Sequence, residues 1–487
     1  MSDIFASRDD QWRRELRDAM PAKERTAIPR AIMPMLPPEF RIHNNMEVNE
    51  GLSADQAVVE ATRCLDCPDP QCVTGCPVGI DIPGFIKNIQ RGDIAQAATV
   101  LRATSALPAV CGRVCPPEKQ CEAKCIYNKM KKAPVAIGWL ERFAADSERL
   151  SGNKPLMPRA AANGKKIAVA GSGPCGLSFA GDMAKLGYKV TVYEALHEIG
   201  GVLKYGIPEF RLPNEIVDAE LDSLRSLGVK FVADTVIGKT LGYDNLLNEG
   251  FDAIFVASGA GLPRFMGIPG ENFINILSSN EYLTRINLMH AGKEGWATPV
   301  PRGKTVAVIG GGNTAMDSVR TARRMGAERA ILVYRRTEDE MPARREEIEH
   351  AKEEGVEFLT LSNPIEYRAD EKGRVSSMLI QKMELGAPDE SGRRSPVAID
   401  GAIEEIPVDV VVVSVGVSPN PLIPDSIDGL EVTRRGTIAV NDSLQSSLPL
   451  IFAGGDIVRG GATVILAMGD GRRAAAAMHQ MLSEQKN

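Results

Sequence analysis

Residues 165–194 read KKIAVAGSGPCGLSFAGDMAKLGYKVTVYE, and this stretch decides the fold. An apolar run at 167–170 precedes Gly171, Gly173 and Gly176, which have G-x-G-x-x-G spacing. A helical segment and a second apolar run at 190–193 follow, ending on Glu194. This order is typical of a dinucleotide-binding fold. There the glycines permit a tight turn and let a pyrophosphate come close to the backbone. An isolated glycine motif is weak evidence, but the strands, helix and terminal acid in register favour nucleotide binding over plain packing.

The same pattern recurs further along the chain. A strand at 305–309 leads to a G-x-G-x-x-A turn, a helix to about residue 325 and a strand at 330–334. The predicted NADP contacts are Gly310, Gly312, Asn313, Thr314, Ala315, Arg335 and Arg336. The two arginines stand where the first copy has Glu194. A guanidinium pair binds a 2′-phosphate through charge-assisted hydrogen bonds, whereas an acid would repel it, so we expect NADP here. The alternative is that both arginines are solvated surface charge.

The C-terminal region suggests that FAD binds the first copy. A strand at 450–453 leads to Gly455 and Asp456, and a helix is expected to begin near Ala462. In flavoproteins with two dinucleotide folds, such an aspartate holds the ribityl chain and the helix N-terminus faces the flavin. Gly200 and Gly201 suit a close backbone approach to FAD, although an ordinary turn is the alternative. We predict an FAD domain at 165–298 and 405–487, with 410–415 as its returning strand, and an inserted NADP(H) domain at 299–404.

Eight of the nine cysteines lie in one region of the chain, which predicts metal ligation in a reducing compartment. They form two runs: Cys64, Cys67, Cys72 and Cys76, and then Cys111, Cys115, Cys121 and Cys125. Zinc sites favour two C-x2-C knuckles, which the second run lacks. The Cys-Pro end of the first run is typical of ferredoxins in which the last cysteine crosses to the other cluster. We therefore predict two [4Fe–4S] clusters, with Cys125 joining Cys64, Cys67 and Cys72.

Bulk properties exclude several classes of protein. The 487 residues are too many for one core, and the net charge of −6 argues against a nucleic-acid partner. No apolar run is long enough for a membrane span or a signal peptide, so a cytoplasmic location is expected. Residues 1–150 are predicted to form a mostly α-helical cluster domain with a linker at 151–164. No chemistry is assigned to the first 50 residues, and Cys175 is expected to be a packing residue.

The motifs together resemble one family. Cysteine quartets precede G-S-G-P-C-G-L, G-G-V-L-K-Y-G-I-P-E-F-R-L-P, G-G-G-N-T-A-M-D, Y-R-R-T and A-G-G-D-I-V-R-G-G-A. Residues 50–485 are similar to the glutamate synthase small (beta) subunit family, which includes the large subunit of NADH-dependent ferredoxin:NADP oxidoreductase. The resemblance implies FAD, NADPH and two [4Fe–4S] clusters with all eight cysteines as ligands. The expected fold is multidomain, with a helical iron–sulfur domain and two α/β Rossmann-like domains, the NADP domain being inserted in the FAD domain.

Three functions follow as alternatives. The first is the electron-input subunit of glutamate synthase, in which hydride passes from NADPH to FAD and electrons then pass through the clusters to a large subunit. The second is a subunit of an electron-bifurcating ferredoxin:NADP oxidoreductase with a ferredoxin-reductase-like small partner. The third, from another class, is a zinc-stabilised redox sensor or scaffold. Because the cofactors carry the hydride chemistry, no catalytic side chain is predicted. A hetero-oligomer with neither nucleic acid nor membrane is expected.

Overall fold

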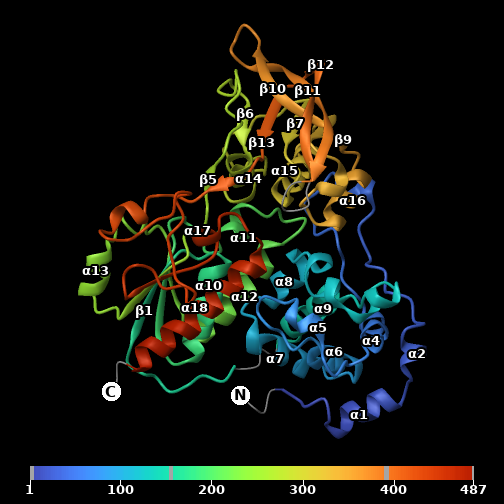
Figure 1. Cartoon of the computed structure of the whole chain (residues 1–487), viewed down its shortest axis with the longest axis vertical. Coiled ribbons are helices and arrows are strands. Elements are labelled where there is room, and N and C mark those ends of the chain that lie inside the picture. Colours follow the sequence, from blue (N-terminus) through green and yellow to red (C-terminus); the bar gives the residue numbers. More distant parts are fainter. Residues whose placement is uncertain (1–4, 153–156, 389–393, 485–487) are drawn as a thin grey trace.

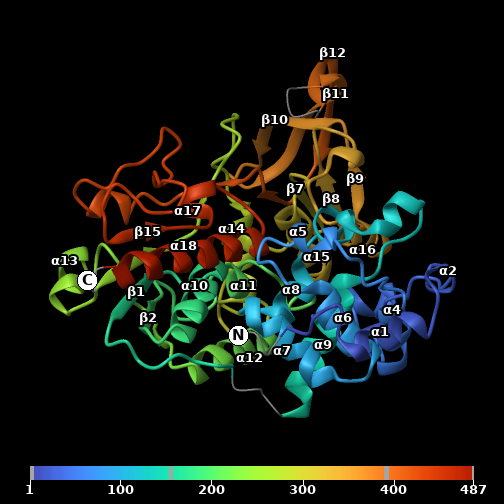
Figure 2. The ribbon, with the colours of Figure 1, turned by 60° about the horizontal axis from the view of Figure 1, so that its bottom comes forward.

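The computed structural model describes residues 5–152, 157–388 and 394–484, and it contains three packed parts. A helical N-terminal domain lies against two parallel-sheet nucleotide folds, as Figures 1 and 2 show from two directions. The second nucleotide fold carries a projecting antiparallel sheet, drawn in orange at the top of Figure 1.

The N-terminal domain consists of short helices joined by the cysteine loops. Side-chain caps set several helix starts: Ser53 and Gln56 form a capping box on α4, and Asp81 accepts a hydrogen bond from the Gly84 N–H on α6. The helices α6 and α7 are separated at Gly92, where φ is +82°. The helices are α1 (Gln11–Asp18), α2 (Ala22–Arg25), α3 (Pro38–Arg41), α4 (Ala54–Thr62), α5 (Gln71–Thr74), α6 (Ile82–Gln90), α7 (Ile94–Thr104), α8 (Pro108–Val114), η1 (Pro117–Lys119), η2 (Glu122–Lys124), η3 (Ile126–Met130) and α9 (Ile137–Ser151).

The first nucleotide fold has a parallel five-stranded sheet in the order β15-β4-β1-β2-β3. Its strands are β1 (Lys166–Ala170), β2 (Lys189–Tyr193), β3 (Lys230–Val232), β4 (Ala253–Val256) and β15 (Ile451–Ala453). Its helices are α10 (Pro174–Lys185), α11 (Val202–Tyr205), α12 (Asn214–Ser226), α13 (Tyr243–Asn248), α17 (Asp456–Arg459) and α18 (Val464–Glu484). The edge strand β15 comes from the end of the chain, so the second fold is inserted within the first, as predicted.

The second nucleotide fold repeats this topology, with a parallel sheet in the order β6-β13-β7-β8-β9. Its strands are β6 (Ile276–Ser278), β7 (Thr305–Ile309), β8 (Arg329–Val333), β9 (Glu357–Leu359) and β13 (Val410–Val413). Its helical elements are α14 (Ser279–Asn287), α15 (Asn313–Arg324), η4 (Glu338–Glu340) and α16 (Arg345–Glu353).

This topology corrects the predicted domain boundaries. The strand expected at 410–415 was assigned to the FAD domain, but β13 pairs in parallel with both β7 and β6 of the second fold. A run of four valines buried on both faces would suit either parallel sheet, so composition could not decide between them. The second fold therefore begins before residue 299 and ends after residue 404.

Two antiparallel features complete the fold. The strands β5 (Leu262–Pro263) and β14 (Val417–Ser418) pair with each other where the chain passes between the two nucleotide folds. The projecting sheet contains β10 (Ser362–Ala369), β11 (Val375–Pro388) and β12 (Arg394–Pro407) and has β11 at its centre. The strands β10 and β11 form an antiparallel hairpin. A short η5 (Pro424–Ser426) precedes β15.

One hydrophobic core is shared by the N-terminal domain and the first nucleotide fold. Its members include Val110 and Leu140 from the helical domain together with Phe179 and Met468 from α10 and α18. Burial of apolar area contributes roughly 25 cal/mol per Å². A core that crosses a domain boundary therefore resists separation of the two domains.

No single helix in the described part of the chain has the length and apolar character to cross a bilayer. The bent pair α7 and α8 passes that test only when the two helices are taken together.

Candidate cofactor sites

The first fingerprint forms a tight turn between β1 and α10. Gly171 has φ +108°, and a Cβ on it would lie 2.4 Å from the Ala257 carbonyl oxygen. A Cβ on Gly176 would lie 2.1 Å from the Gly171 oxygen, so the helix can begin this close to the strand only with glycine. Gly173 faces open space, with no heavy atom within 4 Å of its would-be Cβ. This is the surface that a pyrophosphate needs.

Glu194 lies directly beside this turn and is buried. Its carboxylate accepts hydrogen bonds from the Ser172 N–H (3.0 Å), the Ser172 hydroxyl (2.5 Å) and the Leu196 N–H (3.0 Å). The Ser172 hydroxyl also accepts a bond from the Gly200 N–H (2.8 Å). A carboxylate has about four acceptor sites, so one remains for a ribose hydroxyl.

The predicted FAD contacts from the chain end lie in the same crevice. Tyr205 demonstrates this, because burial, together with the charges of Asp456 and Glu194, raises the pKa of its phenol to about 12. A Cβ on Gly201 would lie 2.9 Å from the Gly173 Cα, so the paired glycines face the fingerprint. The Ser258 hydroxyl, at the end of β4, is a buried polar atom with no hydrogen-bond partner in the described residues. These features fit a dinucleotide.

The turn at Gly455 and Asp456 depends on residues that sequence reasoning missed. Buried Asp470 on α18 accepts hydrogen bonds from the Gly455 N–H (3.1 Å) and from Arg459. Burial would raise the pKa of Asp470, but the bonds from Arg459 and Arg473 hold it below its ordinary value. Asp456 is the opposite case, since burial raises its pKa to about 7.

The position of Ala462 differs slightly from the expectation for a helix start. Its N–H donates to Asp456 Oδ1 (3.1 Å), and α18 itself begins at Val464. The N–H groups that would face a flavin are therefore those at the start of α18, which lies beyond Ala462 in the sequence.

The second fingerprint has the same construction. Gly310 has φ +143°, and its would-be Cβ lies 2.3 Å from the Ser414 oxygen at the end of β13. Gly312 faces nearly open space, with only the Pro342 Cγ at 4.0 Å. The Asn313 side chain accepts a hydrogen bond from the Arg344 N–H (2.9 Å), while Thr314 is exposed and Ala315 is buried in the helix.

The two predicted phosphate-binding arginines are not equivalent. Arg335 is exposed, and no hydrogen bond or ion pair of its side chain is recorded among the described residues. Arg336 donates from Nε to the Arg394 carbonyl oxygen (2.8 Å). Arg335 therefore has its whole guanidinium available for a 2′-phosphate, whereas the Nε of Arg336 is already bonded.

Four cysteines near the N-terminal helices are neighbours, and we call Cys64, Cys67, Cys72 and Cys125 the outer quartet. Burial raises the pKa of Cys67, and the neighbouring Cys64 and Cys125 raise it further. The pKa of Cys72 is raised by burial first, and then by the neighbouring Cys64, Cys125 and Cys67. The backbone groups of Tyr127 and Val135 also hydrogen-bond the Cys125 sulfur.

The other four cysteines, Cys76, Cys111, Cys115 and Cys121, form a second group that we call the inner quartet. A hydrogen bond with Cys115 and burial raise the pKa of Cys111, and Cys76 raises it further. Burial raises the pKa of Cys76 to about 11, against backbone hydrogen bonds from Ile80 and Val78. In the structure, Cys76 thus lies with the cysteines of the second run, and Cys125 lies with those of the first. This is the crossed arrangement expected of two clusters.

The donor set fits clusters better than lone metal ions. Within the described part of the chain, no three His, Cys, Asp or Glu side chains converge to hold a single ion. A zinc site needs four ligands around one centre, whereas each thiolate of a [4Fe–4S] cluster binds a different iron. Eight thiols in two quartets are the donors that two such clusters require.

The inner quartet lies against the first nucleotide fold. The Cys111 and Met468 sulfurs are 3.5 Å apart, and Met468 is on α18. A Cβ on Gly469 would lie 2.9 Å from the Pro77 oxygen, so α18 packs directly on the Cys76–Pro77 loop. The helix that follows the predicted flavin contacts therefore contacts the inner quartet.

The first 50 residues, to which no chemistry was assigned, hold the outer quartet in place. Asp66 lies between Cys64 and Cys67, is fully buried and has φ +52°. Its carboxylate pairs with Arg13 and with Arg17 (2.7 Å), and Arg8 donates to its carbonyl oxygen (2.7 Å). The arginines of this segment follow no recognisable motif, so only the fold reveals their role.

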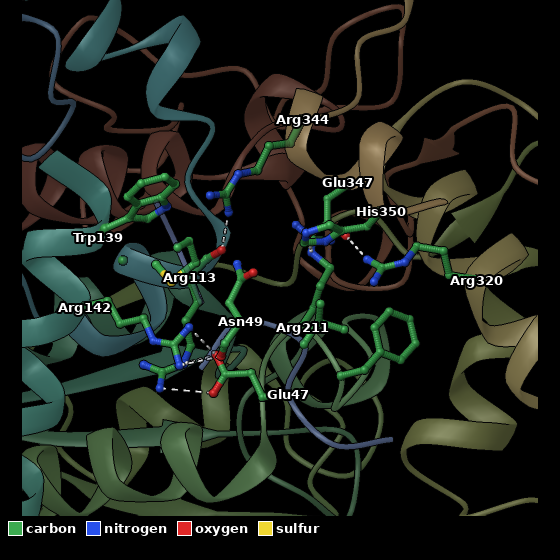
Figure 3. Close-up of a pocket in the computed structure, with 14 residues that line it drawn as sticks. Glu47, Asn49, Arg113, Trp139, Arg142, Arg211, Arg320, Arg344, Glu347 and His350 are labelled. Carbon is green, nitrogen blue, oxygen red and sulfur yellow. Dashed lines mark hydrogen bonds and ion pairs between the residues drawn. The ribbon is translucent and has the colours of Figure 1, made fainter. Parts of the chain in front are cut away.

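A small cavity lies where the three parts of the molecule meet (Figure 3). Its volume is about 10 Å³, which is room for roughly one water and far too little for a nucleotide. Its charged lining consists of Glu47, Arg113, Arg142, Arg211, Arg320, Arg344 and Glu347, with His350 beside them.

Buried ion pairs at this junction fix the second fold on the first. Arg211, from the first fold, donates to both oxygens of Asp317 in the second fold at 2.9 Å, and its Nε lies 3.4 Å from Glu347 Oε1, also in the second fold. Removing one partner of such a pair costs about 3–5 kcal/mol. The two folds are therefore held in one orientation.

Comparison with known families covers almost the whole chain. The profile of the dihydropyrimidine dehydrogenase domain II 4Fe–4S family matches residues 41–153. The profile of the pyridine nucleotide-disulphide oxidoreductase family matches residues 165–471.

Individual relatives agree with these matches. The chain is 36% identical over 449 residues to the glutamate synthase [NADPH] small chain of Escherichia coli K12, covering 91% of this chain and 95% of the relative. It is 38% identical over 438 residues to the beta subunit of the NADP(+)-dependent formate dehydrogenase of Moorella thermoacetica, covering 85% and 60%. The structure of Mycobacterium tuberculosis FprA in complex with NADPH has a TM-score of 0.56 at 20% identity, covering 66% of this chain and 85% of that one. The last similarity concerns the fold alone.

We predict that Asp66→Asn causes selective loss of the outer quartet's metal. Asparagine tolerates the positive φ, so the change removes only the charge that Arg13 and Arg17 need, at a cost of about 3–5 kcal/mol. Iron per chain should fall by about half, and Cys64 and Cys67 should become open to alkylation. Asp69→Asn, an exposed change in the same loop, is the control. Unchanged iron and unchanged thiol protection in Asp66→Asn would contradict the prediction.

We also predict that Arg335→Ala weakens binding of NADPH far more than that of NADH. Loss of a charge-assisted bond costs about 1.5–3 kcal/mol, or roughly 10- to 100-fold in Kd. Titration of each nucleotide measures the effect. Arg329→Ala, which removes an exposed arginine at the other end of β8, should leave both affinities unchanged. Equal losses for NADPH and NADH in Arg335→Ala would remove the NADP assignment.

Proposed function

Because the chain belongs to the family of the glutamate synthase NADPH small chains, we propose that it is the electron-input subunit of a glutamate synthase. It is an NADPH-dependent oxidoreductase of the two-dinucleotide flavoprotein fold with an iron–sulfur domain. In the proposed reaction it oxidises NADPH and delivers electrons to a large subunit. That subunit makes glutamate from glutamine and 2-oxoglutarate.

The observation that carries this proposal is the contact of α18 with the inner quartet. The Met468–Cys111 and Gly469–Pro77 contacts join the helix after the flavin crevice to the cysteine loops. The outer-quartet loop is bonded instead by the N-terminal domain, through Arg8 to the Asp66 oxygen and Lys87 to the Cys64 oxygen. These contacts support a path from the flavin crevice to the inner quartet and then to the outer quartet.

When bound, FAD supplies the conversion of a two-electron hydride into single electrons that iron–sulfur clusters can carry. The chain's own residues would bind the two nucleotides and orient them. Glu194 would take the ribose of FAD, Asp456 the ribityl chain, and Arg335 the 2′-phosphate of NADPH. Backbone N–H groups of Ile80 and Val78 hydrogen-bond the Cys76 sulfur, which is one way in which a protein tunes a cluster.

The other two functions are less well supported. A bifurcating ferredoxin:NADP oxidoreductase would use the same residues, and no feature of the described chain favours it. A zinc-stabilised sensor would need ligands that converge on one ion, which the described residues do not provide. The cytoplasmic location stays a prediction from the sequence.

Several relatives are named as subunits of larger enzymes, which supports a hetero-oligomer. We propose that the large subunit docks over the outer quartet on a basic surface. This lysine surface consists of Lys124, Lys129, Lys131 and Lys132, all exposed and close to Cys125 in sequence. The first three make no recorded ion pair within the described residues, although the chain as a whole is acidic. Unpaired charge of one sign favours an acidic partner surface.

The decisive experiment is anaerobic purification with flavin, iron and sulfide quantified, followed by stopped-flow reduction by NADPH and NADH. One FAD and about eight iron atoms with labile sulfide are expected, since two [4Fe–4S] clusters contain that number. With a glutamate synthase large subunit, NADPH should then support glutamate formation. Zinc without labile sulfide, or a colourless protein, would contradict the proposal.

We predict that the triple variant Lys124→Glu, Lys129→Glu, Lys131→Glu associates with the large subunit at least about tenfold more slowly at low salt, because charge steering is lost. Binding kinetics at two ionic strengths measure this. NADPH-dependent reduction of ferricyanide should be unchanged. The control reverses Lys230, Lys239 and Lys372, which are exposed elsewhere. Equal association of both triple variants would rule out the lysine surface as the docking site.

A further inference from the structure

A short segment of the second fold lies between its fingerprint and the inner quartet. It consists of Pro342, Ala343, Arg344 and Arg345, and we call it the coupling segment. It joins η4 to α16, and Ala343 and Arg344 are buried to within a few per cent. Neither the predicted NADP contacts nor the predicted cluster ligands include it.

On one side, the coupling segment is hydrogen-bonded to the fingerprint. The Ala343 N–H donates to the Gly311 oxygen (3.2 Å), and the Arg344 N–H donates to Asn313 Oδ1 (2.9 Å). Among the described residues, Pro342 supplies the one heavy atom, its Cγ, within 4 Å of a would-be Cβ on Gly312. A pyrophosphate on this glycine turn would therefore lie close to the segment.

On the other side, the coupling segment is hydrogen-bonded to the loops that carry the inner quartet. Arg344 Nη1 donates to the Arg113 carbonyl oxygen, midway between Cys111 and Cys115 (Figure 3). Lys119 Nζ donates to the oxygens of Pro342 (2.7 Å) and Ala343 (3.2 Å). The Arg345 N–H donates to Glu118 Oε1 (3.1 Å). Glu118 and Lys119 lie between Cys115 and Cys121, so these four bonds all join the coupling segment to the inner-quartet loops.

Other buried ion pairs hold the second fold in place. Arg211 pairs with Asp317 and Glu347, so a nucleotide would not rotate the whole second fold freely. A local shift of the fingerprint would instead act on the coupling segment, and through Arg344 on the backbone that carries Cys111 and Cys115. The position of the backbone around the cluster sulfurs is one of the factors that set the reduction potential of a cluster.

We propose that the coupling segment links nucleotide occupancy of the second fold to the redox properties of the inner quartet, with Arg344 as the positioning residue. This inference rests on the proposed function, since it requires both NADP binding and a cluster. Coupling between binding equilibria is reciprocal, so a nucleotide that changes the reduction of the inner cluster must bind the reduced and oxidised forms with different affinity.

The test compares Arg344→Met with Arg345→Met in the holoprotein, using NADP+ as the probe. Methionine keeps the bulk of Arg344 but removes its bond to Arg113 and its ion pair with Glu346, while the backbone bond to Asn313 is retained. The Arg345 side chain is exposed and has no recorded contact in the described residues, so Arg345→Met is the matched control. Midpoint potentials of both clusters are measured by redox titration with and without NADP+.

In the natural protein and in Arg345→Met, NADP+ should shift the inner-cluster midpoint but not that of the outer cluster. The same coupling should appear as a difference of about fivefold or more in NADP+ Kd between the two redox states of the inner cluster. In Arg344→Met both effects should disappear while flavin and iron content are retained. An NADP+ shift that persists in Arg344→Met would overturn the proposal.

Amide hydrogen exchange gives a second readout that needs no electron transfer. In the oxidised natural protein, NADP+ should slow exchange across residues 113–121, and in Arg344→Met it should not. Absence of NADP+ binding or of iron would defeat the proposed function and this inference together. Normal binding and iron content with no NADP+ effect on the inner cluster or on 113–121 would defeat this inference alone.

Discussion

The contact on which the structure depends is the packing of α18 against the loops of the inner quartet. Electron transfer between cofactors weakens steeply with separation, so the flavin crevice and the cysteines must be held together. A shared hydrophobic core does this, since Val110, Leu140, Phe179 and Met468 belong to one buried cluster. Gly469 is needed at the contact because a Cβ there would meet the Pro77 backbone. The two domains thus behave as one support for the cofactors.

The second nucleotide fold is attached differently, through buried charge. Burial would raise the pKa of Glu347, but the arginines around it, Arg211 first, hold that pKa at about 2. Asp317 shows the opposite balance, because its burial outweighs Arg211 and raises its pKa to about 6. Buried pairs of this kind fix an orientation more than they add net stability. They suit an interface in which hydride must pass at one geometry.

The sequence predicted the nucleotide folds well because their signals are local. The glycine spacing, the apolar strands and Glu194 all lie within thirty residues, and the structure has a strand, turn and helix where they were expected. The position of β13 was predicted wrongly because four valines suit any buried parallel strand, and pairing partners are decided by tertiary structure. The role of Asp66 was missed because its partners, Arg13 and Arg17, are about fifty residues away and belong to no motif. Ion pairs between residues far apart in the chain produce no periodic pattern in the sequence.

The order of strands in the first sheet has a consequence for biosynthesis. β4 has β1 on one side, but its other neighbour, β15, is encoded almost two hundred residues later. The entire second fold is translated in between. A nascent chain therefore carries an open sheet edge at β4 until residues 451–453 have been translated. A chain truncated before residue 451 would expose this β-strand edge, which is suited to aggregation.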